Sequence, residues 1–319
     1  MVGGIGAPTP DLEYATLAKF DNLVATGAII WGPSDPEYRD TELPHDIGLL
    51  DNIYDFPVEF RVAPAFSNRL GPVPSYVAGN SKPPSFIGPD PVLVAARIGE
   101  THTLAFSKFC VLRPHFVLYP NQFERHSPEL TGQDLHAAWQ VLKAFPRTPL
   151  MMIHNYGSAS GGLRGHKHME VFPKPGSSGF KLFPDLTKLK LRDVVSVPTV
   201  PYENHIIALS AQTSPEDLEQ KYNNIVSLAA QDLVFDRRTS YNVVMTKDWI
   251  MAIARKCTGL PGLEVDAAGM IGMVWVGSEE EKEAWIDMGP INYLELLGIP
   301  PLQMYDSLSL DRSRYRLDH

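Results

Sequence analysis

The pattern of apolar and polar positions separates an irregular first third of the chain from a more ordered remainder. Proline and glycine are frequent in the first hundred residues, as in PPSFIGPDPV, so we expect an irregular wrap there. Two segments rich in β-branched and aromatic residues follow, at 101–109 and 111–119. They predict two neighbouring strands, with Pro114 interrupting the second.

Three helices are predicted from their capping residues and apolar stripes. Thr131, with Asp134 three positions later, is typical of a capped helix start, and an apolar stripe follows it. Ser214, followed by proline at the first helical position, begins a second helix. Ser278 opens a third helix, which Gly289 closes.

A strand, a loop and a second strand are predicted between the first two helices. LMMIH from Leu150 indicates a buried strand, NYGSASGGLRG a glycine-rich turn, and HKHMEVFP a further strand. Strands and helices that are segregated in this way predict an α+β fold with largely antiparallel sheets and helices on one face. The polar segment from Lys174 predicts a connection, so we place a boundary near Val195, between an N-terminal part (1–195) with the strand–loop–strand unit and a C-terminal part (196–319).

Composition narrows the classes of protein that fit this chain. Its 319 residues, 44% hydrophobic and 20% charged, suffice for an ordinary core and exclude intrinsic disorder. The net charge of −9, without a basic run, argues against nucleic-acid polymers as partners. No apolar stretch approaches the roughly 18 residues needed to cross a bilayer. With two cysteines and no secretory leader pattern, we expect a cytoplasmic protein with a small-molecule partner, and its oligomeric state stays open.

The most informative feature is a row of two histidines and a carboxylate at every second position, His166, His168 and Glu170. On a strand these side chains share one face, whereas on a helix successive members point about 200° apart. A neutral imidazole is both a base and a nucleophile, and a second imidazole or a carboxylate can orient it. Spacing alone leaves open a catalytic row or a half-exposed strand with polar residues outward. The other histidines, among them His115, lack such spacing and are expected to be structural.

The loop that precedes this row changes the balance between the two interpretations. Small and polar residues dominate it, and they are Asn155, Gly157, Ser158, Ser160 and Gly161. Such residues allow close approach of the backbone to a ligand and can present N–H groups to an anion. A loop of this kind beside a histidine row indicates phosphate chemistry.

The order N-x-G-x-x-S-G followed by H-K-H resembles the active-site signature of the diadenosine polyphosphate phosphorylases, or ATP adenylyltransferases. This family is a branch of the histidine-triad superfamily and is related to galactose-1-phosphate uridylyltransferase. The resemblance extends over about residues 93–301, through SKFCVLRPHFVLYPNQFE, LTGQDLHAAWQVL, VPYENHIIAL, YNVVMTKDWIMAIARK and MGPINYLELLGIP. It implies an α+β fold of two histidine-triad-like halves.

The resemblance also implies a role for each residue of the site. His168 would attack the α-phosphorus of a dinucleotide and form a nucleotidyl-histidine, which inorganic phosphate resolves to a nucleoside diphosphate. His166 would help to orient the site. The implied substrate-binding residues are Asn155, Gly157, Ser158, Ser160, Gly161, Arg164, Lys108 and Lys82. A histidine nucleophile splits one difficult displacement into two easier steps, and positioned lysines stabilise the transferring group.

Two departures from the family pattern keep alternatives open. Leu163 stands where the family has a serine, and Glu170 stands where it has a glutamine. An ionised carboxylate repels a phosphate nearby, so the pocket is expected to be retuned. The leading interpretation is a nucleotidyl-transferring phosphorylase or hydrolase acting on a dinucleoside polyphosphate. The alternatives are acid–base chemistry on a small metabolite by a lyase, isomerase or cyclase, and a non-catalytic binder. We predict no cofactor, although H-x-H-x-E also leaves a divalent metal site open.

Overall fold

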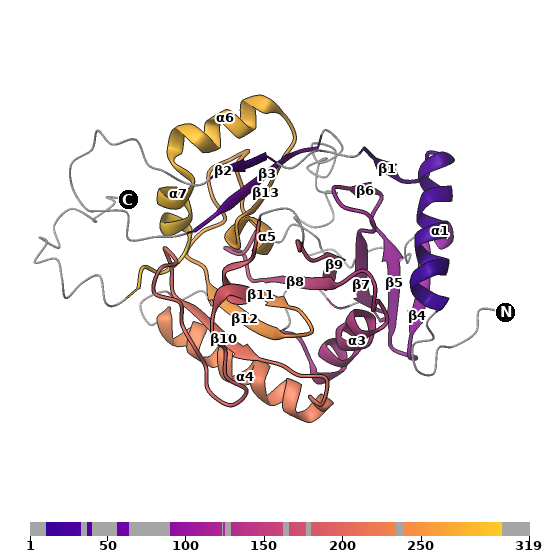
Figure 1. Ribbon diagram of the computed structural model, residues 1–319, viewed down its shortest axis with the longest axis horizontal. Coiled ribbons are helices and arrows are strands. Elements are labelled where there is room, and N and C mark those ends of the chain that lie inside the picture. Colours follow the sequence, from indigo (N-terminus) through magenta and orange to yellow (C-terminus); the bar gives the residue numbers. More distant parts are fainter. Residues whose placement is uncertain are drawn as a thin grey trace, which may run out of the picture.

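An eight-stranded antiparallel sheet forms the centre of the protein (Figure 1). The computed structural model describes residues 11–32, 37–39, 56–63, 90–122, 124, 129–161, 166–176, 180–233 and 239–301. In spatial order the strands are β10 (Asn204–Ala208), β12 (Trp249–Ala254), β11 (Tyr241–Met245), β8 (Leu150–Tyr156), β9 (Met169–Pro173), β7 (Phe116–Pro120), β5 (His102–Phe106) and β4 (Val94–Ile98). Strands from both sides of the boundary expected near Val195 share this sheet.

The sheet is covered on both faces, and the sequence of β8 supplies apolar side chains to each face. Leu150 and Met152 point into one apolar cluster, whereas Met151 and Ile153 point into another on the opposite face. Because successive side chains of a strand alternate between faces, a strand buried on both sides must be apolar at every position. The unbroken apolar run LMMI meets this requirement.

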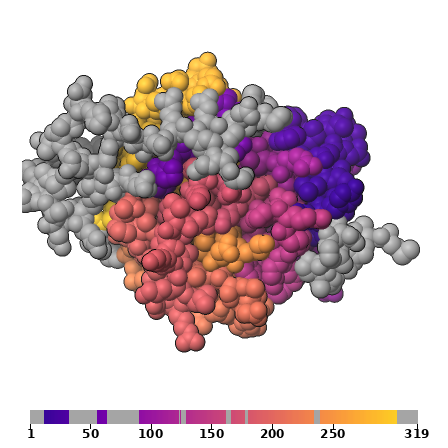
Figure 2. All heavy atoms as spheres, viewed as in Figure 1, coloured from indigo at the N-terminus to yellow at the C-terminus, as the bar shows by residue number. Residues whose placement is uncertain are grey.

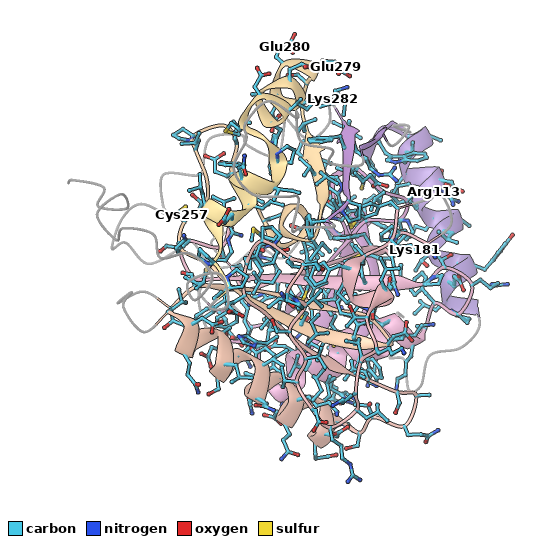
Figure 3. The ribbon with its side chains drawn as sticks, turned by 60° about the vertical axis from the view of Figure 1, so that its left-hand side comes forward. Arg113, Lys181, Cys257, Glu279, Glu280 and Lys282 are labelled. Carbon is cyan, nitrogen blue, oxygen red and sulfur yellow. The ribbon has the colours of Figure 1, made fainter. Side chains whose placement is uncertain are left out.

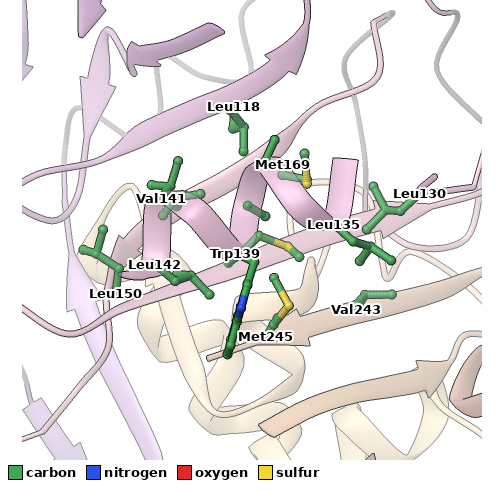
Figure 4. Packing of buried hydrophobic residues seen from close by; sticks show 14 of the residues in the cluster. Leu118, Leu130, Leu135, Trp139, Val141, Leu142, Leu150, Met169, Val243 and Met245 are labelled. Carbon is green, nitrogen blue, oxygen red and sulfur yellow. The ribbon is translucent and has the colours of Figure 1, made fainter. Parts of the chain in front are cut away.

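Three helices cover one face of the sheet, and they are α1 (Asp11–Ala25), α3 (Gly132–Lys143) and α4 (Pro215–Asp232). Thr131 and Asp134 form the expected capping box at the start of α3, and Ser214 caps α4. Trp139 of α3 lies in the cluster between this helix and the sheet, close to Met245 of β11 (Figure 4). This face therefore forms the larger apolar core.

The opposite face carries a small second sheet and three further helices. The sheet has the order β13 (Met273–Val276), β3 (Val58–Val62) and β2 (Glu37–Arg39), and the helices are α5 (Ala267–Met270), α6 (Glu279–Met288) and α7 (Pro290–Leu297). The remaining elements are the two-stranded pair β1 (Ile30–Trp31) and β6 (Phe109–Cys110) and the 3-10 turns η3 (Pro91–Leu93) and η4 (Phe183–Leu186). Figure 2 shows the first helix and the last helices at different edges of the molecule, with middle segments of the chain between them.

The first helix is fixed to the loop that precedes β7. The guanidinium of Arg113 donates from Nε and Nη2 to the two carboxylate oxygens of Asp21, at 2.7 and 2.6 Å. Arg113 accordingly lies against α1 in Figure 3, and its hydrogen bonds lower the pKa of Asp21. No helix within the described ranges is long and apolar enough to cross a membrane.

The expected α+β class, with antiparallel strands, is confirmed, and so are the three helix starts at Thr131, Ser214 and Ser278. The expectation of an irregular first hundred residues is wrong for 11–25, which form α1. That helix packs its apolar side on the sheet, so tertiary contacts determine it more than any cap. Helix α7 was not expected either.

Replacing Trp139 by alanine tests the core under α3. Trp139 is 1% exposed, so its removal leaves a large cavity, and we expect a loss of about 3–5 kcal/mol of unfolding free energy in urea titrations. Leu191→Ala is the matched control, because Leu191 is 53% exposed and its loss should change stability by less than about 0.5 kcal/mol. Equal effects of the two substitutions would contradict this description of the core.

Candidate active site

The histidine row lies where β9 begins, in the middle of the large sheet (Figure 1). Glu170 on β9 pairs with Val117 on β7 and with Ile153 on β8. Strand β9 begins at Met169, so His168 directly precedes it, and the same register continued by two residues puts His168 opposite Asn155, the penultimate residue of β8. Opposite residues of an antiparallel pair share one face of the sheet, so this register puts both side chains on the face that carries Glu170.

The backbone holds the ring of His168 in one orientation. Its Nδ1–H donates to the carbonyl oxygen of His166 at 2.9 Å, and its own carbonyl accepts the Nδ1–H of His154 at 2.8 Å. Because the hydrogen bond of one ring nitrogen determines the tautomer, the lone pair of a neutral His168 resides on Nε2. That nitrogen has the electronic form a nucleophile requires.

His166 is held by backbone groups of the segment after β7. Its Nε2 lies 3.2 Å from the carbonyl oxygen of Pro120, and its Nδ1 lies 2.8 Å from the carbonyl oxygen and 3.2 Å from the amide nitrogen of Glu124. The ring also packs edge-on against Tyr119, with 5.9 Å between centroids. These contacts suit a residue that orients its neighbours.

Glu170 lies between two imidazoles. Its Oε2 accepts the Nε2–H of His115 at 2.8 Å, and its Oε1 lies 4.0 Å from Nε2 of His168. His115 is fully buried between the rings of Phe172 and Trp275. The carboxylate that was expected to repel a phosphate therefore has a buried cationic partner whenever His115 is protonated.

Lys167 stands between the two histidines of the row, but its side chain is buried and contacts carboxylates outside the row. Its ammonium lies 2.6 Å from Oδ2 of Asp134 and 2.9 Å from Oε2 of Glu124, and Oδ1 of Asp134 accepts the Nε2–H of His102 at 2.9 Å. Burial alone raises the pKa of Asp134, but hydrogen bonds from His102, Lys167 and Thr131 outweigh it and lower that pKa below 3.8. The stability contributed by the ionised Asp134 is therefore present above about pH 3.8 and lost as the pH falls.

The glycine-rich loop is shaped by the protein as much as by any ligand. Gly157 and Gly161 both have φ of +81°, and a Cβ at Gly161 would meet the backbone of Val265. A Cβ at Gly157 would meet the hydroxyl of Ser240. Ser160 is fully buried, and its hydroxyl donates to the carbonyl of Gly157 at 2.8 Å. The loop is therefore closed internally and seated on the second half of the chain.

Asn155 is oriented by hydrogen bonds from two other segments. Its Oδ1 accepts the Nδ2–H of Asn242 at 2.7 Å and the amide of Ala267 at 2.9 Å. Asn242 is fully buried on β11, and its Oδ1 in turn accepts a hydrogen bond from Arg255. Neither Asn242 nor Arg255 was expected from the sequence, although Asn242 is a polar residue within the apolar strand β11 and Arg255 directly follows the apolar strand β12.

The structure brings most of the predicted site residues together. His166, His168, Glu170, Asn155 and the loop 157–161 lie at adjoining ends of β8 and β9. Ser158 is exposed there, whereas a contact of Ser160 with substrate stays a prediction, because its hydroxyl already bonds within the loop.

Of the remaining predicted substrate ligands, only Lys108 is among the described residues, and it stands apart from this group. Lys108 lies in the turn between β5 and β6, at the Phe116 end of β7, whereas the register places His168 at the other end. Lys82 and Arg164 lie outside the described residues. Their roles stay predictions.

The H-x-H-x-E row is not arranged as a metal site. Both ring nitrogens of His166 lie against backbone groups, and Glu170 is bound to His115. Across the residues that the structure describes, no group of three or more histidine, cysteine or acidic side chains is placed to hold a metal ion.

Comparison with known sequences identifies two domains in succession. The profile of the Ap4A phosphorylase N-terminal domain matches residues 76–189, and that of the ATP adenylyltransferase C-terminal domain matches residues 198–300. Protein APA1 of Saccharomyces cerevisiae is 26% identical over 204 residues, 57% of this chain and 63% of that protein. Diadenosine 5',5'''-P1,P4-tetraphosphate phosphorylase 2 of the same yeast is 26% identical over 234 residues, 62% of this chain and 70% of that protein. The chain thus spans a little under two thirds of APA1.

Solved structures share the fold. The crystal structure of yeast Ap4A phosphorylase Apa2 in complex with Ap4A has a TM-score of 0.71 and 22% sequence identity, and the match covers 94% of this chain and 99% of that one. The complex with AMP gives the same TM-score and identity. At this identity the likeness shows the fold alone.

His168 directly precedes β9 and has its lone pair on Nε2, so it is suited in form to the nucleophile of enzymes that transfer groups through a histidine. The N-terminal and C-terminal halves of the sequence both match domains of one such family. The chain belongs to the ATP adenylyltransferase and Ap4A phosphorylase family.

Replacing Lys167 by methionine tests the buried ion pairs that hold the row. The substitution leaves Asp134 buried without its cation, so we expect a loss of about 3–5 kcal/mol of unfolding free energy. Lys190→Met is the control, because Lys190 and its partner Asp193 are both mostly exposed and should contribute less than about 1 kcal/mol. Urea unfolding of the two variants at pH 7 gives the comparison, and an unchanged Lys167→Met midpoint would refute the role of these ion pairs.

Proposed function

We propose that this chain is a dinucleoside polyphosphate phosphorylase that transfers a nucleotidyl group through His168. The observation that carries the proposal is the hydrogen bond from His168 Nδ1–H to the carbonyl of His166, which leaves the lone pair of the ring on Nε2. The relatives that bear the names of Ap4A phosphorylases support diadenosine tetraphosphate as the substrate.

The chemistry takes two displacements. In the first, the lone pair of His168 Nε2 attacks the α-phosphorus, a P–N bond forms, and the P–O bond to the leaving nucleoside polyphosphate breaks. In the second, an oxygen of inorganic phosphate attacks the same phosphorus, and the P–N bond breaks. A nucleoside diphosphate is released, and the imidazole is restored with its Nδ1 proton still donated to His166.

The residues around His168 stabilise different parts of this reaction. The bond to the His166 carbonyl stabilises the positive charge that the ring gains when it is nucleotidylated. Asn155 presents its amide nitrogen, because its oxygen is occupied by Asn242 and Ala267. Donors that are fixed before substrate arrives cost no reorganisation during the reaction.

The setting that we propose for this activity is the cytoplasm. Cys257 is an exposed thiol, and a thiol of this kind persists in a reducing compartment. The proposed substrate is a soluble small molecule, which agrees with this location.

A labelled α-phosphate on the dinucleotide tests the covalent step. The wild-type chain should retain the label as an acid-labile phosphoramidate, and His168→Ala should abolish both the adduct and turnover. His205→Ala is the control, because His205 lies on β10 and binds Asp232 away from this site. Turnover without any adduct on the wild-type chain removes the covalent route.

Glu170→Gln tests whether the carboxylate opposes the transfer. Two unit charges about 4 Å apart repel by about 4 kcal/mol at an effective dielectric of 20. His115 offsets part of this, so we expect phosphorolysis of diadenosine tetraphosphate to rise by roughly tenfold. A glutamine oxygen can still accept the His115 Nε2–H, which preserves the local fold. A fall of about 10²-fold or more would instead indicate acid–base chemistry by Glu170 and contradict the proposal.

A further inference from the structure

Arg255 is a fully buried guanidinium whose hydrogen-bond acceptors are all neutral. It donates to Oδ1 of Asn242 at 2.5 Å, to the carbonyl of Cys257 at 2.9 Å and to the carbonyl of Ser160 at 3.4 Å. Among the described residues, no carboxylate lies within ion-pairing distance of it. A buried charge without a partner costs several kcal/mol, and folded proteins rarely retain one without a use.

The charge survives at neutral pH. Burial lowers the pKa of Arg255 to about 10, and nearby Cys257 and Asp266 partly oppose that shift. The guanidinium therefore remains protonated near pH 7 and makes the interior behind the loop electropositive. The other buried cation of the site, Lys167, differs because two carboxylates surround it.

A chain of hydrogen bonds joins Arg255 to the substrate face. Arg255 occupies the oxygen of Asn242, so the amide nitrogen of Asn242 must point the other way, and it donates to Oδ1 of Asn155 at 2.7 Å. The Asn155 oxygen is thereby turned inward, where the amide of Ala267 also binds it. Each amide fixes the orientation of the next, and the chain ends with an N–H donor of Asn155.

The loop is oriented by the same cation. The carbonyl of Ser160 accepts the Nδ2–H of Asn242 at 2.9 Å and faces Arg255. Since a trans peptide places its N–H opposite to its C=O, the amide of Gly161 points away from Arg255. The amide nitrogen of Asn155 and the N–H of Gly161 are therefore the ends left for a ligand, and they carry the polarity that an anion requires.

We propose that Arg255 is a positioning residue for anion recognition, which acts through Asn242 to aim the donors of Asn155 and the loop at the phosphate groups of the substrate. The inference rests on the proposed function for its ligand class, a nucleoside bearing phosphate. It assigns the selectivity for the charged part of that ligand to a residue that does not touch it.

Calorimetric binding of AMP and of adenosine to the full chain tests the proposal. In Arg255→Met the affinity for AMP should fall by about 10–100-fold, as expected for loss of hydrogen bonds that involve a charged group, while the affinity for adenosine changes by less than about threefold. Arg255→Lys, which keeps the charge, should recover part of the AMP affinity. Arg192→Met, an exposed site, removes the same net charge and should leave both affinities unchanged.

A second variant keeps the test decisive if Arg255→Met does not fold. Asn155→Asp retains an inward oxygen for Asn242 and Ala267 but replaces the outward donor by a negative charge, so AMP affinity should fall selectively there too. Equal losses for AMP and adenosine, or wild-type binding of AMP no tighter than that of adenosine, overturn the inference.

The two proposals can fail separately. A labelled adduct on His168, together with equal losses of AMP and adenosine affinity in Arg255→Met, retains the proposed function and overturns the inference. A selective loss of AMP affinity without any adduct retains the inference and overturns the covalent route.

Discussion

The pairing of β8 with β9 on one side and with β11 on the other is the interaction on which the rest of the structure depends. It closes the sheet between the two halves of the chain. It also places Asn155 beside Asn242 on β11 and Ile153 beside Glu170 on β9. A shift of the strand register by one residue would turn Asn155 toward the apolar core under α3 and a core residue toward the site. The packing of the core and the arrangement of the site therefore require the same register.

The buried charged side chains around the histidine row and the loop have two kinds of partner. The ammonium of Lys167 has a buried carboxylate partner, and the carboxylate of Glu170 accepts a hydrogen bond from the buried His115, and such contacts hold segments in place. Arg255 has neutral partners, so its field is available to whatever binds next to the loop. The contrast explains how a chain with a net charge of −9 can still carry a locally positive region beside the loop.

Local signals in the sequence predicted what local chemistry determines. The capping box of Thr131 depends on a few neighbouring residues and is present in the structure. The row of His166, His168 and Glu170 was expected on one strand, but β9 begins at Met169, so only Glu170 lies on it. Partners that are distant in the chain were not predictable. His115 reaches Glu170 across 55 positions, and its lone occurrence in the sequence carries no sign of that contact. The glycines also proved to be required by neighbouring backbone, which no spacing rule reveals.

The carboxylate of Asp134 completes the first turn of α3 and also binds the residue between the two histidines. One oxygen accepts the Thr131 amide and the Lys167 ammonium, and the other accepts His102. Separating residues 166–168 from α3 would expose the Asp134 carboxylate, which also caps the first turn of this helix. The start of α3 and the segment 166–168 therefore open together, and solvent exchange of their amides should report a single cooperative unit rather than two.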